Sequence, residues 1–231
     1  MKKLVALCLQ MGGILCLLLM VPMTAVAQDK VVVIPLNSSK YVPGGVNTVT
    51  SAGGQVWMDR NLGALRVATK SADPDSYGTL YQWGRGGDGH EYRSSSTTST
   101  QSGTNDPIHG SFITGFTDWL SSPDTTLWQG ESGTNNPCPA GFRLPTDTEW
   151  EIERNSWSSN NSAGALASPL KLPAAGYRSY NDTLYFAGSY GLYWSAEVVG
   201  SNSRYLLFNS GSADMNSSNR AFGFSVRCLK D

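Results

Sequence analysis

The chain contains few residues suited to metal or thiol chemistry. Among 231 residues there are two histidines and four cysteines. His90 and His109 are nineteen residues apart, and neither has a partner at the i, i+4 spacing that places two metal ligands on one helix face. Serines are abundant, yet no G-x-S-x-G motif marks one of them as a nucleophile. The sequence therefore offers no histidine cluster for iron and no recognisable hydrolase site.

Charge is also scarce, because charged residues make up 15% of the chain, with 17 basic and 18 acidic side chains. No run of basic residues is present, so we expect neither nucleic acid nor an anionic membrane surface as a partner. The chain is instead rich in Gly, Ser, Asn and Thr, and it contains seven Trp and ten Tyr. This composition is typical of a loop-rich, β-containing domain with aromatic anchors.

One long hydrophobic run stands at the start of the chain. Lys2 and Lys3 precede an apolar stretch over residues 4–21, and residues 25–27 (AVA) form a small-residue cleavage site. This order predicts a secretory signal peptide over residues 1–27, cut before Gln28. A retained membrane anchor is the alternative, which the cleavage site disfavours. We therefore expect a secreted, periplasmic or cell-surface protein with no membrane span after cleavage and a net charge of 15 − 18 = −3.

Cleavage would remove Cys8 and Cys16 and leave Cys138 and Cys228 as a pair. Disulfides persist in the oxidising conditions met by exported proteins, so we expect these two cysteines to be joined. The loop closed would hold roughly 90 residues, for which the chain-entropy estimate is about 4 kcal/mol of stabilisation. A reactive or metal-binding thiol pair is the alternative.

The mature chain is expected to divide into an N-terminal segment and one globular domain. Residues 30–36 (KVVVIPL) form a short apolar, β-rich run that reads as an isolated strand or a connector. It lies within a linker over residues 28–48, and the domain follows over residues 49–231.

The clearest local signal is a helix start. Thr146 is a good N-cap, and Glu149 three residues later completes a capping box. Trp150 and Arg154 are four residues apart and share one face. The pattern predicts a short helix that runs to about Ser156.

Strands are predicted from β-rich runs bounded by Gly, Ser and Asn. The first lies at residues 55–62, and four more follow at residues 170–177, 192–198, 204–209 and 222–229. In the last of these, Phe224, Val226 and Cys228 alternate with Ser225 and Arg227. This period of two predicts a half-buried strand with its cysteine on the core face.

Five motifs in order resemble one known family. They lie at residues 57–62 (WMDRNL), 136–146 (NPCPAGFRLPT), 149–151 (EWE), 193–196 (YWSA) and 223–228 (GFSVRC). Together they resemble the Fibrobacter succinogenes major paralogous domain, over roughly residues 49–231.

That family is similar to the formylglycine-generating sulfatase-modifying enzymes, and both resemble the C-type lectin fold. The resemblance implies an α+β domain with a twisted antiparallel sheet, one or two short helices, long loops and chain ends that lie close together. It implies no single activity. The enzymes use two active-site cysteines that hold copper, and this pair has no counterpart here, since Cys228 matches a structural cysteine.

A candidate ligand surface lies in the polar and aromatic segment before the closing motif. Aromatic rings with amide and carboxylate neighbours suit glycan or peptide recognition. The candidate residues are Trp194, Glu197, Asn202, Arg204, Tyr205, Asn209, Asp214, Asn216 and Asn219. An ordinary hairpin with Trp194 in the core is the alternative. The Asn/Ser-rich segment also resembles the variable regions of retroelement-diversified lectin-fold proteins, whose varied positions form the ligand surface.

We expect no cofactor. Asp73, Asp75 and Asp88 could supply oxygen ligands for calcium, but turn formation explains their Gly/Pro/Asp-rich settings better. His90 and Glu91 beside Asp88 likewise read as a solvated loop.

The first functional hypothesis is a non-catalytic binding module that recognises a glycan or a protein outside the cytoplasm. A structural component of a cell-surface assembly, joined through strand addition by residues 30–36, is the second. A sulfatase-modifying enzyme is the third.

Overall fold

The computed structural model of the chain describes residues 46–231. The expected signal peptide, the strand at residues 30–36 and all but the last three residues of the linker lie outside the described part. Among the described residues, no helix is long and apolar enough to cross a membrane.

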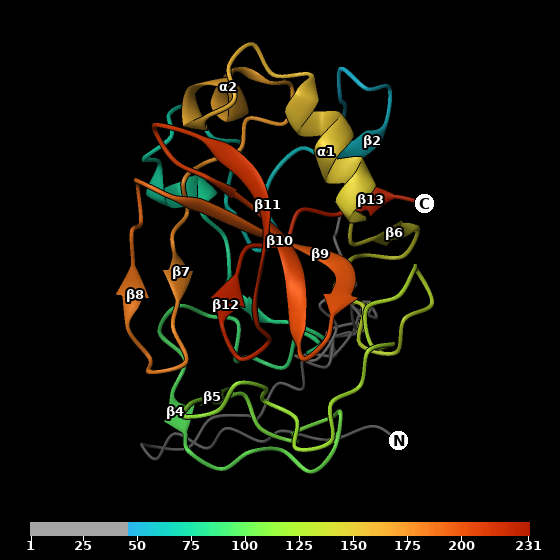
Figure 1. The fold of residues 1–231 in the computed structure, drawn as a ribbon, viewed down its shortest axis with the longest axis vertical. Coiled ribbons are helices and arrows are strands. Elements are labelled where there is room, and N and C mark those ends of the chain that lie inside the picture. Colours follow the sequence, from blue (N-terminus) through green and yellow to red (C-terminus); the bar gives the residue numbers. More distant parts are fainter. Residues whose placement is uncertain (1–45) are drawn as a thin grey trace, which may run out of the picture. The chain divides into compact units, whose positions relative to one another are not determined.

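The described part is an α+β domain built from short elements, and its sheets are mainly antiparallel (Figure 1). In chain order the elements are β1 (Thr48–Thr50), β2 (Val56–Met58), the 3₁₀ helix η1 (Pro74–Ser76), β3 (Tyr81–Gln82), β4 (Thr97–Thr98), β5 (Phe112–Ile113), β6 (Phe142–Arg143), α1 (Asp147–Asn155), α2 (Ser162–Ala167), β7 (Tyr177–Arg178), β8 (Leu184–Tyr185), β9 (Gly191–Val199), β10 (Asn202–Phe208), β11 (Ala213–Asn219), β12 (Gly223–Phe224) and β13 (Leu229–Lys230).

Three antiparallel sheets organise the domain. The longest strands form a sheet in the order β11-β10-β9, with an irregularity between Ser203 and Tyr205. A second sheet has the order β3-β12-β7-β8, and a third has the order β1-β2-β13-β6. The third sheet pairs the first strands of the described part with the last one. A short parallel pair, β4 and β5, lies apart from these sheets.

The β11-β10-β9 sheet separates two hydrophobic clusters. Because side chains alternate along a strand, successive residues of β9 enter different clusters. Trp194 packs with Phe224 and Trp83 in one cluster, whereas Tyr193 packs with Trp150 in the other. This sheet is therefore buried on both faces over much of its length.

The helix prediction is confirmed. α1 begins after Thr146, whose side chain accepts a hydrogen bond from the Glu149 backbone N–H, while the Glu149 carboxylate accepts one from the Thr146 N–H. The helix ends at Asn155, and its residue Trp150 is fully buried.

The strand predictions are right for β9 and β10 and less accurate elsewhere. The first strand is shorter than predicted, since β2 covers three residues. Residues 170–176 are buried but not a strand, because Pro173 has no N–H to donate and Lys171 has a positive φ of 49°. The segment at residues 222–229 forms two short strands. Between these strands the backbone bonds to two different segments. The Ser225 N–H donates to the Leu192 carbonyl, and the Val226 carbonyl accepts from the Leu62 N–H.

The prediction of a half-buried final strand is wrong, since Arg227 is 1% exposed. Its guanidinium donates to the Asn61 side-chain oxygen at 2.9 Å, the Leu170 carbonyl at 2.8 Å and the Met58 carbonyl at 3.3 Å. Burial lowers the pKa of Arg227 to about 10, so the side chain remains charged at neutral pH. No carboxylate within the described residues forms an ion pair with it.

Three other arginines are also buried and hold loops together. Arg85 donates to the carbonyls of His109 and Ser111. Arg178 donates to the carbonyls of Tyr92 and Ser95, and Arg220 donates to the Gly200 carbonyl at 3.5 Å and to the Ser203 hydroxyl. These side chains supply donors to backbone carbonyls that no sheet satisfies.

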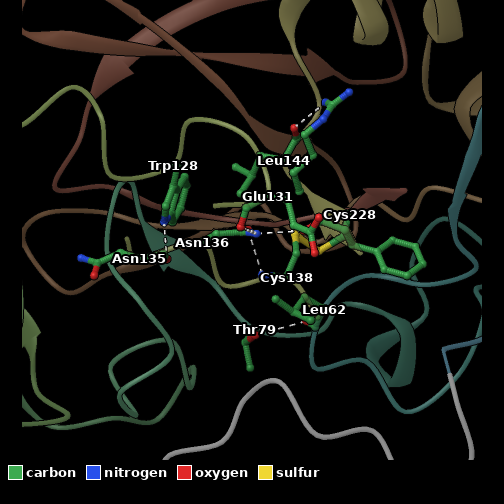
Figure 2. The surroundings of a disulfide bond; sticks show 11 residues. Leu62, Thr79, Trp128, Glu131, Asn135, Asn136, Cys138, Leu144 and Cys228 are labelled. Atoms are coloured by element: carbon green, nitrogen blue, oxygen red, sulfur yellow. Dashed lines mark hydrogen bonds between the residues drawn. A yellow bond between two sulfur atoms is a disulfide. The ribbon is translucent and has the colours of Figure 1, made fainter. Parts of the chain in front are cut away.

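The predicted disulfide between Cys138 and Cys228 is confirmed, with the Cα atoms 5.8 Å apart and both residues fully buried. Figure 2 shows Asn136 beside it. Its side-chain oxygen accepts from the Cys138 N–H at 3.1 Å, and its amide donates to the Phe142 carbonyl at 2.8 Å. The bond joins residues 90 apart and ties the segment before α1 to the last strand region.

Reduction of the disulfide should lower the free energy of unfolding by about 4 kcal/mol, because the unfolded chain regains the freedom of a long loop. Urea unfolding with and without reductant measures the effect, and the Cys138→Ala/Cys228→Ala variant should match the reduced protein. An unchanged midpoint on reduction would contradict the expectation.

Arg227→Met should destabilise the fold by about 3–5 kcal/mol, because it leaves the Asn61 side-chain oxygen and two buried carbonyls without their donor. Lys70→Met, which removes one positive charge from an exposed turn, is the matched control and should change stability by less than about 0.5 kcal/mol. Equal effects in chemical denaturation would show that the buried hydrogen bonds are unimportant.

Candidate ligand-binding surface

The nine candidate residues do not form one surface. Trp194 is fully buried, which corrects its assignment as an exposed platform. Its indole N–H donates to the Tyr81 carbonyl at 2.8 Å, and its ring stacks on Phe224 with centroids 4.2 Å apart. Because its ring belongs to a buried hydrophobic cluster, Trp194 is a core residue, as the alternative interpretation held.

Two charged candidates bind the start of α1 instead of solvent. The Arg204 guanidinium pairs with the Asp147 carboxylate at 2.5 Å. The Glu197 carboxylate accepts a hydrogen bond from the Asp147 N–H at 2.7 Å, and burial raises the pKa of Glu197. Both side chains therefore fix the helix against the sheet.

The remaining candidates divide between the two faces of the β10–β11 hairpin. Residues directly opposite each other in an antiparallel pair share a face. Tyr205 lies opposite Asn216, and Leu207 lies opposite Asp214, so these four share one face. The other face carries Asn202 opposite Asn219 and Arg204 opposite Ser217, while Asn209 lies in the turn that follows β10.

A larger aromatic surface lies beside Tyr205. It gathers partly exposed rings from β7, the β7–β8 turn, β8, the segment after β8, β10 and the residue before β12. We call this set the aromatic surface; its members are Tyr177, Tyr180, Tyr185, Phe186, Tyr190, Tyr205 and Phe222. Figure 1 shows β7 and β8 as a hairpin along one edge of the domain, with β12 next to it.

The rings of the aromatic surface contact one another in a continuous chain. Tyr177 is at its centre, with ring centroids 5.5 Å from Tyr185, 6.1 Å from Phe186 and 5.8 Å from Phe222. Phe186 is 4.6 Å from Tyr190, and Phe222 is 5.3 Å from Tyr180. These distances fall within the range of favourable aromatic pairs.

Tyr205 joins the chain through the core. Its ring centroid lies 4.7 Å from that of buried Phe224, which is 5.9 Å from Tyr177. The surface is thus anchored on the same cluster that holds Trp194.

The backbone around Phe186 is strained. Phe186 has a φ of +54°, a conformation that bulky residues rarely adopt, yet its side chain is 51% exposed. Gly176 permits this arrangement, because a Cβ there would lie 2.3 Å from the Tyr185 carbonyl oxygen. The strand pair therefore closes tightly and presents Phe186 outward.

The tyrosine hydroxyls remain available to solvent. Within residues 46–231, those of Tyr177, Tyr180, Tyr185, Tyr190 and Tyr205 make no hydrogen bond with another side chain or carbonyl. Burial raises the pKa of Tyr177 and Tyr205, so these hydroxyls stay neutral and can both donate and accept.

A second cluster, Asp88, His90 and Glu91, brings potential metal ligands within 4.8 Å of one another. The prediction of a solvated loop is wrong, since His90 is fully buried. The Gln82 backbone N–H donates to His90 Nε2 at 3.1 Å, so Nδ1 carries the proton and donates to Asp88 at 2.7 Å. Both ring nitrogens are therefore committed to the protein, and the imidazole has no lone pair left for a metal.

The acidic residues considered for calcium have protein partners as well. Asp73 accepts from Thr69 and from the Arg66 guanidinium, and the hydrogen bonds from Thr69 lower the pKa of Asp73. Asp75 is exposed and pairs with Arg66, while the Asp88 carboxylate also accepts from Arg85. The turn interpretation explains these residues.

Sequence reasoning missed the aromatic surface, although a signal was present. Five of its rings lie within residues 177–190, which is a high local density of aromatic residues. The predicted strand ends at Tyr177, and the Gly, Ser and Asn residues after it indicate turns.

Residues 138–229 match the profile of a domain of unknown function (DUF8237). No curated protein and no solved structure matches the chain. The matched segment begins at one cysteine of the disulfide and ends one residue beyond the other. It contains both α-helices, the β11-β10-β9 sheet and the whole aromatic surface.

Stability should fall as the pH drops from about 6.5 to about 4, through His90. Burial and the Arg85 charge lower the pKa of His90 from 6.5 to about 4, so the unfolded chain binds a proton in this window and the folded chain does not. The loss attributable to this group is about 3 kcal/mol.

Denaturation midpoints at several pH values measure this loss of stability. His90→Asn should flatten the pH dependence between these limits, whereas His109→Asn, which changes an exposed loop histidine, should leave it as in the parent protein. A parallel pH dependence in all three proteins would exclude His90 as the source.

Proposed function

We propose that the chain is a non-catalytic binding module that recognises a glycan or a protein outside the cytoplasm through the aromatic surface. The observation that carries the proposal is Phe186, an exposed aromatic side chain held at positive φ. A non-glycine residue in this conformation is less stable by roughly 1 kcal/mol or more, and because the side chain is 51% exposed, burial of the ring offsets only part of that cost. Folding alone would favour glycine here, so contact with a ligand explains why phenylalanine is present.

The composition of the surface supports recognition. Contiguous exposed apolar rings mark interaction sites, and tyrosine adds a hydroxyl to each ring. Asp214 and Asn216 border Tyr205 and are exposed, which supplies a carboxylate and an amide beside the rings. Such rings can stack on the C–H faces of sugars or on apolar protein side chains, while the polar groups select orientation.

The surface offers little for covalent chemistry. Burial raises the pKa of Tyr177 and Tyr205, so neither supplies a phenolate, and Asp214 has no histidine or cysteine near it in the pairing of β10 and β11. Cys138 and Cys228 are joined, so neither offers a thiolate. Binding without turnover accounts for these features most simply.

We also propose that the domain has a C-type-lectin-like fold and is related to the Fibrobacter succinogenes major paralogous domain. Two features support this: β1 and β2 pair in one sheet with β13, so the ends of the domain meet, and the helices are few and short. The predicted signal peptide and the disulfide support an extracytoplasmic location, where such a bond persists.

Phe186→Gly tests the proposal, because it removes the ring and relieves the strained φ. We expect at least a tenfold loss of affinity for the ligand found by screening glycan and extracellular-protein arrays, with equal or higher thermal stability. Affinity is measured by calorimetry and stability by thermal unfolding.

Ile108→Gly is the matched control. Ile108 is also highly exposed and has a positive φ of 22°, but it lies outside the aromatic surface. This variant should bind as the parent protein does. If Phe186→Gly retains full affinity, the aromatic surface is not the binding site.

A further inference from the structure

A polar pocket lies next to the aromatic surface, where four segments meet. It has a volume of about 450 Å³. The segments are the loop before η1, the start of α2, the stretch after β8 and the β10–β11 turn, which Figure 1 shows beside α2. The side chains used below are Ser71, Ser162, Ser189, Tyr190, Asn209 and Ser210.

The pocket is lined by neutral polar groups, with no charged residue among them. Within residues 46–231, none of the four serine hydroxyls hydrogen-bonds to another residue. Each can donate and accept, so together they can satisfy several hydroxyl groups of a bound molecule.

Asn209 presents donors to the pocket in a fixed orientation. Its side-chain oxygen accepts from the backbone N–H groups of Gly211 at 2.7 Å and Ser212 at 3.1 Å. These bonds orient the carboxamide and leave its N–H₂ group without a partner among the described residues. Gly211 adds no side chain, and a Cβ there would meet only the Asn209 oxygen, at 3.4 Å, so a ligand can approach its backbone closely.

Tyr190 connects the pocket to the aromatic surface. It lines the pocket, and its ring centroid lies 4.6 Å from that of Phe186. A molecule that fills the pocket can therefore continue over Phe186 and Tyr177.

We propose that this pocket binds one neutral sugar residue of a glycan whose remaining units lie across the aromatic surface. This inference rests on the proposed function and selects the glycan over the protein ligand. Hydroxyls, a free amide donor and one aromatic ring match a pyranose, which has hydroxyls around its edge and C–H groups on its faces. An acidic sugar would find no cation in the lining with which to pair.

The triple variant Ser71→Ala/Ser189→Ala/Ser210→Ala tests the pocket. Calorimetry or saturation-transfer NMR would use glucose, galactose, mannose and N-acetylglucosamine as probes, with glucuronic acid as the charged comparison. We expect the parent protein to bind at least one neutral sugar more tightly than glucuronic acid, and the variant to lose at least tenfold in affinity. The control Ser121→Ala/Ser122→Ala/Ser201→Ala changes three exposed serines elsewhere and should bind as the parent does.

The outcomes separate the two proposals. If the triple variant binds neutral sugars as the parent does while Phe186→Gly loses binding, the pocket assignment is overturned and the aromatic surface stands. If no neutral sugar binds but binding of a protein ligand requires Phe186, the pocket assignment is likewise overturned and the aromatic surface stands. If neither variant affects any ligand, both proposals are wrong. Equal binding of glucuronic acid would also overturn the assignment to neutral sugars.

Discussion

The guanidinium of Arg227 is the interaction on which the interior of this domain depends. It joins Met58 and Asn61, three residues apart near the start of the domain, to Leu170, and it lies one residue before the disulfide cysteine Cys228. Most strands here are only two or three residues long, so many backbone groups lie outside the sheet ladders. A buried carbonyl without a donor is costly, and a planar group with five N–H donors can satisfy several at once. Arg85, Arg178 and Arg220 also donate to loop carbonyls, which explains how a chain with little regular structure retains a buried core.

This arrangement also positions the aromatic surface. The β11-β10-β9 sheet is covered on both faces near Trp194 and Tyr193, so its middle has no free face for a ligand. The exposed aromatic rings instead lie where the β7–β8 hairpin and β12 meet the sheet, and Arg178 holds that hairpin from below through Tyr92, Ser95 and Asp182. Exposed rings on an anchored hairpin lose little freedom on binding, which favours affinity. The polar pocket at Tyr190 is held by a different contact. The hydrogen bond from the Ser162 N–H to the Asn209 carbonyl joins α2 to the β10–β11 turn.

Local signals with one physical meaning were predictable from the sequence. The capping box at Thr146 and Glu149 is satisfied within four residues, so tertiary contacts were not needed to recognise it. The pairing of Cys138 with Cys228 followed from their number and setting. The last strand region was misjudged at Arg227 because alternation identifies two faces but does not show whether the second face is covered. β11 was missed for a related reason: its Ser, Asn and Asp residues have low β-propensity, and pairing with β10 along seven residues overrides it.

The division of the nine candidate residues follows from the same alternation. They were grouped because they are close in sequence, but neighbours along a strand point to opposite faces. Tyr205 thus reaches the aromatic surface, while Arg204, its neighbour, reaches Asp147 at the start of α1. Sequence proximity defines a site on a loop, as at Asn209, where consecutive residues share one solvent-facing turn. On a hairpin, cross-strand partners define a site instead, so Asp214 and Asn216 belong with Tyr205. Phe186 is far from Tyr205 in sequence, yet it belongs to the same surface because ring contacts through Tyr177 and Phe224 connect them.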